Sequence, residues 1–278
     1  MIKGTQAPPF VERLRAAAAR NDSWLCVGLD PDPELLPTGV TLDAFLKGII
    51  DATRDQVCCY KPNLAFFEAL GLDGYAALRG VLEALRPEVP VLVDAKRGDT
   101  PQTMRAYARA IFDVLGADAV TLNPYMGGDS LAPFFEYADR GVFVLCKTSN
   151  AGSGELQDLL VDGQPLFVHV ARRAVTWDQH GTLGLVVGAT YPSEVAAVRE
   201  VAPEAPILLP GVGAQAGDLE RSVRAAVDSQ GRGALVNASR SLLYASRGDD
   251  WQTAARAEAE RMRTAINAAR ASAATTTR

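Results

Sequence analysis

The stretch VPVLVDAKRGD, residues 89–99, places charged side chains at the end of an apolar run. The valine-rich half predicts a buried β-strand. Side chains two residues apart share one face of a strand, so Asp94 and Lys96 point together, while Asp99 falls in the loop beyond. Buried charges are costly unless they are paired or functional. A lone D-x-K of this kind is more often a solvated strand end, so the rest of the chain decides between the two interpretations.

Short apolar runs recur along the chain, with helical segments between them. This alternation is typical of βα units and of a parallel sheet. The runs predict eight strands, at 24–30, 57–61, 89–96, 119–123, 142–147, 183–188, 207–210 and 234–237. Eight strands in a chain of 278 residues predict a single-domain (β/α)8 TIM barrel with parallel strands.

The remaining segments fit around this barrel. A first helix at 10–20 would cover the N-terminal opening, and a long insertion at 149–182 separates the fifth strand from the sixth. We expect the barrel domain to span residues 1–270. The run 271–278 is rich in alanine and threonine, which predicts a frayed C-terminal tail.

The composition is that of a globular protein, with 48% hydrophobic and 22% charged residues. No apolar stretch is long enough to span a bilayer, and residues 1–9 lack the apolar core of a signal peptide. These features predict a cytoplasmic protein that does not contact membranes. A formal net charge of -5 argues against a nucleic-acid partner, so any phosphate site should be small and local.

The cysteines and histidines exclude several kinds of chemistry. The four cysteines lie in apolar runs without metal-ligand spacing, which predicts buried thiols rather than disulfides or a zinc site. The only histidines, His169 and His180, fall in a stretch with helical periodicity, which argues against a Ser-His-Asp triad or a histidine metal site. An enzyme of this composition would work with carboxylates and lysines.

The predicted strand ends carry polar side chains, and enzymes with this fold place their sites at that end of the barrel. These residues are Asp30, Lys61, Asp94, Lys96, Asn123 and Lys147. The loops after the seventh and eighth strands, where such barrels commonly bind phosphate, contain Gly211, Gly213 and Arg240. Glycine N–H groups and an arginine side chain can together hold a phosphate, so a phosphorylated substrate is the better interpretation.

Several motifs resemble the orotidine 5'-phosphate decarboxylase family. They are DAKRGD at 94–99, LPGVGAQ at 209–215 and Arg240-Ser241. The stretches KTSNAGS at 147–153 and VVGATYP at 186–192 look like the longer bacterial branch of that family. The resemblance therefore spans the predicted barrel.

The resemblance implies a cofactor-independent, metal-free lyase that decarboxylates orotidine 5'-monophosphate to UMP and CO2 in pyrimidine biosynthesis. Lys96 would protonate C6 of the pyrimidine, and Lys61, Asp94 and Asp99 would complete a charged array with it. In the family the second aspartate enters from the neighbouring subunit, so Asp99 and Thr100 should serve the partner's site in a homodimer. Thr100 is itself a departure, because the family more often has an aliphatic residue there.

The same resemblance implies the substrate contacts. Asp30, Lys61 and Thr103 would contact the ribose, and Ser149 would read the pyrimidine edge. Gln215 would bridge base and phosphate, and Arg240 would hold the phosphate. The remaining expected contacts are Thr100, Pro210, Gly211 and Gly213.

Two other functions stay open. Related barrels share the D-x-K-x-x-D pattern, so a metal-dependent sugar-phosphate decarboxylase or aldolase is one alternative. It would need a Mg2+ site, and no further acid at the neighbouring strand ends clearly supplies one. The other alternative is a non-catalytic nucleotide-binding barrel. A binding protein would gain little from the costly array of Lys61, Asp94, Lys96 and Asp99, so the array favours an enzyme.

Overall fold

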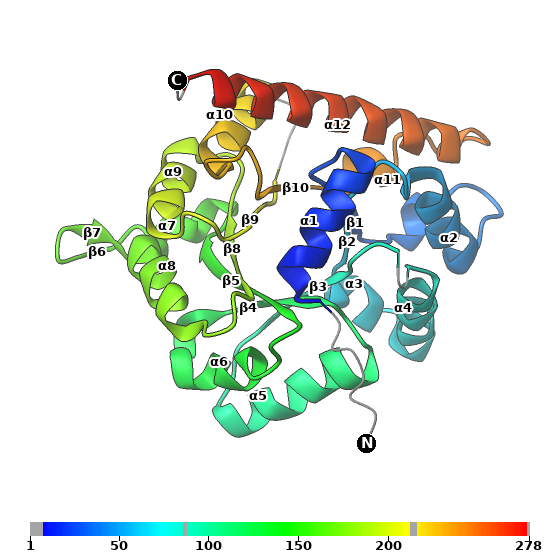
Figure 1. Cartoon of the computed structure of the whole chain (residues 1–278). Helices are drawn as coiled ribbons and strands as arrows, with labels where there is room; N and C mark the ends of the chain where they lie inside the picture. The colour runs from blue at the N-terminus through cyan, green and yellow to red at the C-terminus, as the bar shows by residue number, and fades with distance from the viewer. Residues whose placement is uncertain (1–7, 86–87, 212–215, 277–278) are drawn as a thin grey trace.

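Eight parallel strands form one sheet within the residues that the structure, a computed structural model, describes, namely 8–85, 88–211 and 216–276 (Figure 1). Their order in the sheet is β2-β1-β10-β9-β8-β5-β4-β3. The strands are β1 Leu25–Leu29, β2 Cys59–Pro62, β3 Leu92–Arg97, β4 Ala119–Leu122, β5 Gly141–Lys147, β8 Leu183–Val187, β9 Ile207–Leu209 and β10 Ala234–Ala238. Each one lies on a run that the sequence predicts as a strand, so the predicted barrel is confirmed.

The two edge strands of this sheet, β2 and β3, meet through isolated bridges. These bridges pair Tyr60 with Val91 and Asn63 with Asp94, and they bring the barrel close to full closure. All residues of β1, β8 and β10 are buried, as expected for parallel strands that have side chains inside the barrel and helices outside it.

Helices surround the barrel and connect successive strands (Figure 1). Thr41 caps α2 by accepting the amide of Ala44, and Pro192 begins α9, where its fixed φ suits the first turn of a helix. The α-helices are α1 Phe10–Asn21, α2 Leu42–Thr53, α3 Leu64–Glu68, α4 Gly71–Leu85, α5 Pro101–Ala108, α6 Gly128–Phe135, α7 Gly154–Gln157, α8 Leu166–Trp177, α9 Pro192–Val201, α10 Ala216–Ala226, α11 Arg240–Leu243 and α12 Trp251–Thr276. Short helical turns are η1 Pro33–Leu35, η2 Arg109–Val114, which is a π-helix, η3 Pro124–Met126 and η4 Ala151–Ser153.

Helix α1 lies across one end of the barrel (Figure 1). The ring of Phe10 meets the ring of Phe143 edge to face, with 5.8 Å between the centroids. Gly141, the first residue of β5, has no side chain to obstruct this contact, because a Cβ there would lie 2.4 Å from the Phe10 ring. Helix α1 therefore covers the N-terminal opening, as predicted.

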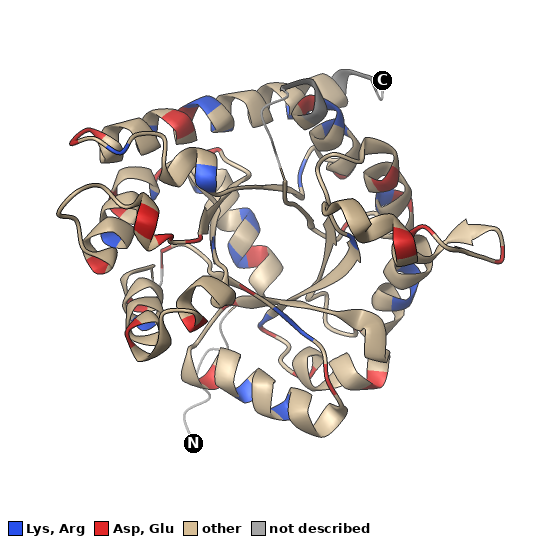
Figure 2. Cartoon of the chain, turned by 180° about the vertical axis from the view of Figure 1, so that it is seen from behind, with Lys and Arg blue, Asp and Glu red and all other residues tan. Residues whose placement is uncertain are grey.

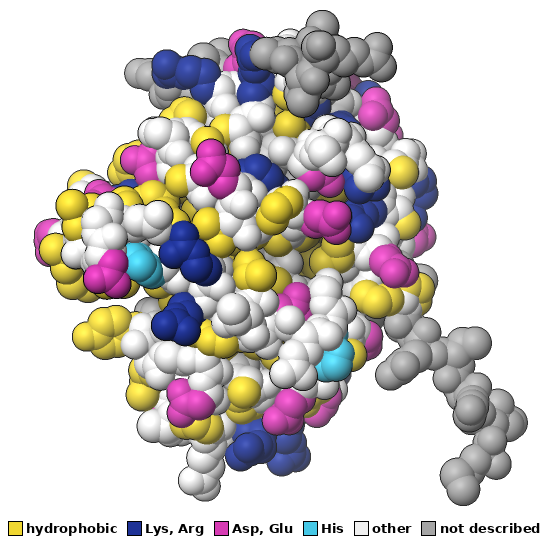
Figure 3. Space-filling model, turned by 60° about the vertical axis from the view of Figure 1, so that its left-hand side comes forward, with side chains coloured by type: hydrophobic (Ala, Val, Ile, Leu, Met, Phe, Trp, Pro, Cys, Tyr) yellow, Lys and Arg dark blue, Asp and Glu magenta, His cyan; other side chains and the backbone are white. Residues whose placement is uncertain are grey.

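The insertion between β5 and β8 contains more structure than its composition suggests. After η4 and α7, a small antiparallel hairpin pairs β6 Leu160–Val161 with β7 Gln164–Pro165, and α8 follows. Asp162 and Gly163 both have positive φ in the two-residue turn, the geometry that Asp-Gly favours. Figure 3 shows this side of the molecule, where the hairpin projects with hydrophobic side chains at its surface.

The C-terminal segment differs from the expected frayed tail. Helix α12 continues to Thr276, and residues 277–278 lie outside the described residues. Alanine has the highest intrinsic helix propensity, so an alanine-rich run can prolong a helix that is already packed on the barrel. No helix in the described part of the chain is both long and apolar enough to cross a membrane.

Candidate active site

Charged side chains from β2 and β3 meet at the C-terminal end of the barrel. The ammonium of Lys61 lies 2.9 Å from one carboxylate oxygen of Asp94, and the ammonium of Lys96 lies 2.6 Å from the other. Figure 2 views the molecule from this side, with α1 behind the strands. The D-x-K pair at the strand end is therefore an ion-paired cluster rather than a solvated run.

The three side chains of this cluster differ in their exposure. Lys61 and Asp94 are 4% and 9% exposed, whereas Lys96 is 47% exposed and borders the opening. Burial on its own would raise the pKa of Asp94, but the charges of Lys61 and Lys96 together lower that pKa well below its usual range. Burial also acts to lower the pKa of Lys61, and the negative charges of Asp94 and Asp30 outweigh it and raise this pKa. Lys61 and Asp94 are therefore both ionised at neutral pH.

The backbone at Lys96 is held in an unusual conformation. Its φ is +45°, in the left-handed region, and the pairing of β3 with β4 shifts register between Val93 and Arg97. Such a conformation costs about 1–3 kcal/mol in a residue other than glycine. The irregularity turns Lys96 away from regular strand geometry while its ammonium still reaches Asp94.

Thr121 on β4 supports this arrangement, and the sequence analysis did not identify it. Its hydroxyl donates to Asp94 Oδ1 over 2.8 Å and accepts the backbone N–H of Lys96 over 3.0 Å. The side chain is almost fully buried. A polar residue in the otherwise apolar run 119–122 was the only signal for it in the sequence.

Asp99 lies outside this cluster within one chain. Its carboxylate accepts the backbone N–H of Thr100 over 2.6 Å and forms no ion pair with any residue that the structure describes. Thr100 occupies the N-cap position of α5, and its hydroxyl lies 3.3 Å from that of Thr103. Of the four expected catalytic residues, the structure therefore joins Lys61, Asp94 and Lys96.

Asp30 directly follows β1, close to Gly28, where the lack of a side chain leaves room for Ser239. A Cβ at Gly28 would lie 1.9 Å from the hydroxyl oxygen of Ser239 and 3.3 Å from Asp30 Oδ2, so only glycine fits there. Asp30 Oδ1 and Asn237 Oδ1 are buried without a hydrogen-bond partner among the described residues. Unpaired buried acceptors cost about 1–3 kcal/mol each, and proteins commonly tolerate this cost at functional sites.

Ser149, beyond the end of β5, packs against the backbones of two neighbouring strand ends. A Cβ at Gly188 would lie 3.1 Å from Ser149 Cβ, and one at Gly211 would lie 3.0 Å from it. The carbonyl of Pro210 accepts the N–H of Ala189, which ties the same two strand ends together. The structure therefore brings Ser149 and Gly211 together.

The phosphate loop is described in part. Gly211 has a φ of +80°, which favours glycine, and Arg240 is an exposed residue at the first position of α11. The Arg240 guanidinium forms no hydrogen bond or ion pair within the described ranges. The expected contacts Gly213 and Gln215 lie outside the described residues.

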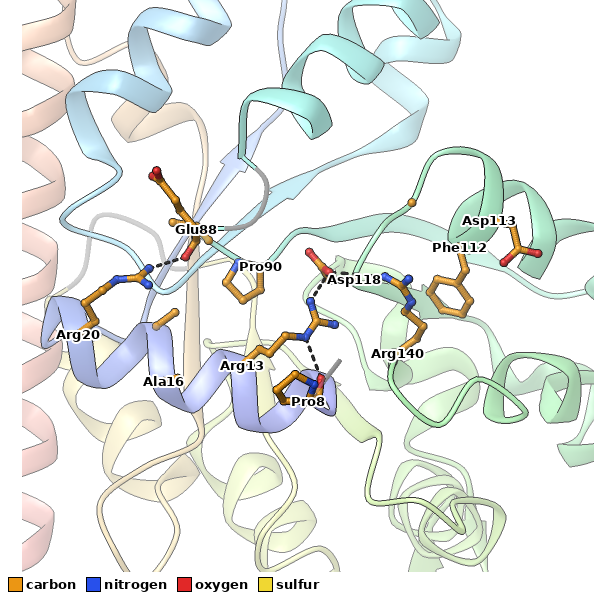
Figure 4. A pocket seen from close by; sticks show the side chains of 13 residues that line it. Pro8, Arg13, Ala16, Arg20, Glu88, Pro90, Phe112, Asp113, Asp118 and Arg140 are labelled. Atoms are coloured by element: carbon orange, nitrogen blue, oxygen red, sulfur yellow. Dashed lines mark hydrogen bonds and ion pairs between the residues drawn. The ribbon is translucent and has the colours of Figure 1, made fainter. Parts of the chain in front are cut away.

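A cavity of about 780 Å³ lies at the opposite end of the barrel, beside α1 (Figure 4). The guanidinium of Arg13 pairs with Asp118, which also accepts the backbone N–H of Val91 and lies 3.6 Å from Arg140. These contacts hold α1 on the starts of β3 and β4. Barrel enzymes react at the other end, so we interpret this cavity as structural.

The other sequence predictions concern cysteines, histidines and metals. All four cysteines are free and buried, as predicted. His169 lies in α8 and its ring contacts the carbonyl of Val161, whereas His180 lies in the loop after that helix. Among the described residues, no three His, Cys, Asp or Glu side chains are grouped so that they could hold a metal ion.

The fold and the site together define a (β/α)8-barrel enzyme that works with lysine and carboxylate side chains. Residues 23–257 match the model of the orotidine 5'-phosphate decarboxylase / HUMPS family, and the chain belongs to that family.

Full-length relatives agree with this assignment. The chain is 52% identical to the orotidine 5'-phosphate decarboxylase of Roseiflexus sp. (strain RS-1), over 94% of this chain and 98% of the relative. The structure of Leishmania donovani OMP decarboxylase superimposes with a TM-score of 0.82 and 43% identity, covering 94% and 98% of the two chains. Leishmania donovani UMP synthase superimposes with a TM-score of 0.84 and 45% identity over 95% of this chain, which spans only 57% of the synthase.

Proposed function

We propose that this chain decarboxylates orotidine 5'-monophosphate to UMP and CO2, without a cofactor, in pyrimidine biosynthesis. One observation carries the proposal: a member of this family holds Lys61, Asp94 and Lys96 in contact at the mouth of its barrel. The array is costly to bury, and a reaction that develops charge beside it is the use that explains the cost.

The reaction itself explains why charged residues are needed. When the bond between C6 and the carboxylate breaks, the electron pair stays on C6 in the plane of the ring. It is orthogonal to the π system, so delocalisation cannot stabilise it. Electrostatic stabilisation by fixed charges must take its place.

Lys96 is the residue that supplies this stabilisation. Its ammonium is held by Asp94, and its side chain is the most exposed of the three at the mouth of the barrel. As CO2 leaves, the cation stabilises the pair on C6 and then transfers a proton to it, which gives UMP and a neutral amine. The amine regains a proton from solvent. General acid catalysis of this kind contributes about 10² to 10⁴ in rate.

Repulsion between Asp94 and the substrate carboxylate plays a smaller part. Two unit charges about 4 Å apart repel by about 4 kcal/mol at an effective dielectric near 20. Enzymes lower their barriers by about 8 to 23 kcal/mol, so this repulsion alone is too small. Stabilisation of the transition state by Lys96 therefore takes the larger share.

The substrate contacts follow from the positions around the mouth. Asp30 and Lys61 would bind the ribose, and Ser149 beside Gly211 would read the pyrimidine edge. Arg240 has no partner among the described side chains, which suits a free phosphate clamp. Pro210, Gly213 and Gln215 would complete the site, and binding far from C6 would orient the substrate.

We further propose a cytoplasmic homodimer with shared sites. The Asp99 carboxylate has no cation partner within the described chain, which supports a role in a second subunit's site. Thr100 on the same segment would accompany it, and Thr103 would contact the ribose. In such a dimer the charge array is completed only by association.

A turnover assay tests the activity. Purified protein mixed with orotidine 5'-monophosphate should remove the substrate absorbance and release CO2 in the presence of EDTA. Activity that disappears with EDTA and returns with Mg2+ would instead favour the metal-dependent alternative. Tight UMP binding without turnover would point to a non-catalytic nucleotide-binding barrel.

A further inference from the structure

Lys147, the last residue of β5, is a buried cation outside the Lys61–Asp94–Lys96 cluster. Its side chain is 2% exposed, and its ammonium lies 2.7 Å from each carboxylate oxygen of Asp158. The ring of Tyr191 covers it, with 5.0 Å between the ammonium and the ring centroid. Burying a cation is costly even when its partner, like Asp158, is half-exposed, so this pair calls for a local function.

The pair closes a loop at the mouth of the barrel. Asp158 and its neighbour Gln157 stand at the end of α7, and they hold the adjacent residues Lys147 and Thr148 at the end of β5. Gln157 Oε1 accepts the backbone N–H of Thr148 over 2.8 Å, and its amide donates to the Thr148 hydroxyl over 2.9 Å. The side chains of Gln157 and Asp158 therefore hold the two ends of the segment 149–156 close together.

Ser149 is the first residue of this fastened segment. It packs against Gly188 at the end of β8 and against Gly211 after β9, at the distances given above. The carbonyl of Lys147 also accepts the N–H of Gly188 over 2.8 Å. The position of Ser149 in the mouth is therefore fixed from one side by Lys147 and its partners.

We propose that Lys147 is a positioning residue that holds Ser149 in place through its contacts with Asp158 and Tyr191. The inference rests on the proposed function, in which Ser149 reads the pyrimidine edge. Lys147 itself would not touch the substrate, because its ammonium is enclosed by Asp158 and the Tyr191 ring. It would act on base recognition and leave the ribose and phosphate contacts unchanged.

The test compares two ligands by calorimetry, UMP and ribose 5-phosphate, which has a hydroxyl group at C1 in place of the base. Lys147→Met should weaken UMP binding about tenfold, the value of one well-placed hydrogen bond, and leave ribose 5-phosphate binding unchanged. Ser149→Ala should have the same effect. The double variant should bind UMP no more weakly than Ser149→Ala alone, because both changes remove the same contact.

Matched variants separate positioning from general destabilisation. Asp158→Glu keeps a carboxylate and should retain the wild-type preference for UMP over ribose 5-phosphate. Asp158→Asn should lose this preference, as Lys147→Met does. Arg256→Met removes another two-point ion pair, with Asp55, on a helix away from the mouth, and it should leave the ratio of the two affinities at the wild-type value. If Lys147→Met fails to fold, the two variants at the half-exposed Asp158 still provide the test.

The outcomes are distinguishable. Wild-type preference for UMP that persists in Lys147→Met or Asp158→Asn overturns the inference and leaves the proposed function standing. Additive losses of UMP affinity in the double variant of Lys147→Met and Ser149→Ala also overturn the inference. A wild-type protein that neither prefers UMP nor turns over orotidine 5'-monophosphate overturns the proposed function, and the inference with it.

Discussion

Lys96 combines an exposed ammonium with a buried anionic partner, and this combination decides its role. We expect Lys96→Ala to abolish turnover while the protein stays folded. Loss of the general acid alone costs about 10² to 10⁴ in rate, and loss of the cation adds to this. Steady-state rates and a circular dichroism melt measure the two effects. Turnover within about tenfold of wild type would refute the assignment.

The role of Arg240 depends on a guanidinium that has no partner among the described side chains. Arg240→Ala should weaken binding of UMP far more than it lowers the melting temperature, because a charge-assisted phosphate contact is lost. Uridine, which lacks the phosphate, should bind the variant and the wild type alike. A variant that still discriminates UMP from uridine as strongly as wild type would contradict the clamp.

Asp94 links the site to stability and to pH. Asp94→Asn removes the ion-pair partner of the buried Lys61, so we expect the free energy of unfolding to fall by about 3–5 kcal/mol at pH 7. The pKa of Asp94 is lower in the folded state than in the unfolded chain. Its contribution is therefore full above about pH 4 and is lost as pH falls toward the folded pKa.

Urea unfolding of wild type and Asp94→Asn at pH 7 and pH 3 checks this prediction. The difference in free energy of unfolding between the two proteins should be smaller at pH 3. At that pH the unfolded wild-type chain takes up a proton at Asp94 that the folded protein excludes. Lys61 behaves in the opposite sense: its raised pKa adds stability below about pH 10.5, which is lost at higher pH. A difference in free energy of unfolding that is larger at pH 3 than at pH 7 would show that Asp94 is not ionised in the folded protein.

At the scale of elements, the end of β3 is held from outside the barrel by Arg97. Its guanidinium lies 2.5 Å from Glu68 at the end of α3 and 5.0 Å from the ring centroid of Tyr107 on α5. Its carbonyl accepts the N–H of Asn123 after β4. These contacts stabilise the left-handed backbone at Lys96, because they fix the residue that follows it.

We therefore expect Arg97→Met to lower kcat by about tenfold or more with little change in KM, since small misplacements of a catalytic group can cost 10². Steady-state kinetics measures the split between the two constants. Arg105→Met, an exposed position on α5, is the control and should leave both constants unchanged. A rise in KM alone would mean that Arg97 acts on binding instead.

The elements were predictable to different degrees. The eight strands follow from apolar runs such as 89–93, because a parallel strand buried on both faces must be apolar throughout. The hairpin at 160–165 was missed although Asp162-Gly163 is a typical two-residue turn, since its strands are only two residues long. The length of α12 was missed because the run after residue 270 was interpreted as a frayed tail, although its alanines favour continuation of the helix.

The site was predictable where residues share a strand end and less so elsewhere. Asp94 and Lys96 are two positions apart on β3, so strand periodicity predicts that they lie together. It does not predict the left-handed backbone at Lys96 or the register shift between Val93 and Arg97. Thr121 could not be derived, because its role depends on the register between β3 and β4. The pairing of Lys147 with Asp158 depends on how the insertion folds back, which no periodicity encodes.

At the scale of the whole molecule, the position of Asp99 predicts complementation between inactive chains. Lys96→Ala and Asp99→Asn chains should each be inactive alone. In a mixed dimer one site would keep both residues and the other would lack both. Random reassortment gives half mixed dimers, so about a quarter of wild-type activity should return under isologous pairing.

The experiment mixes the two variants under conditions that dissociate subunits and then restores native conditions. Exchange of differently tagged chains, measured by co-purification, is the control for reassortment. If exchange is complete and activity stays at the level of the separate variants, Asp99 serves its own subunit and the shared-site proposal is wrong.

The strands β2 and β3 meet at a seam of two isolated bridges rather than a continuous ladder. Lys61 lies on one side of the seam and Asp94 on the other, so their ion pair crosses it. An unfolding chain that opens along this line separates the two charges before any other strand pair is lost. Barrel closure and assembly of the charged cluster therefore depend on the same junction, so a molecule opened there would keep its other strand pairs but lose the Lys61–Asp94 contact.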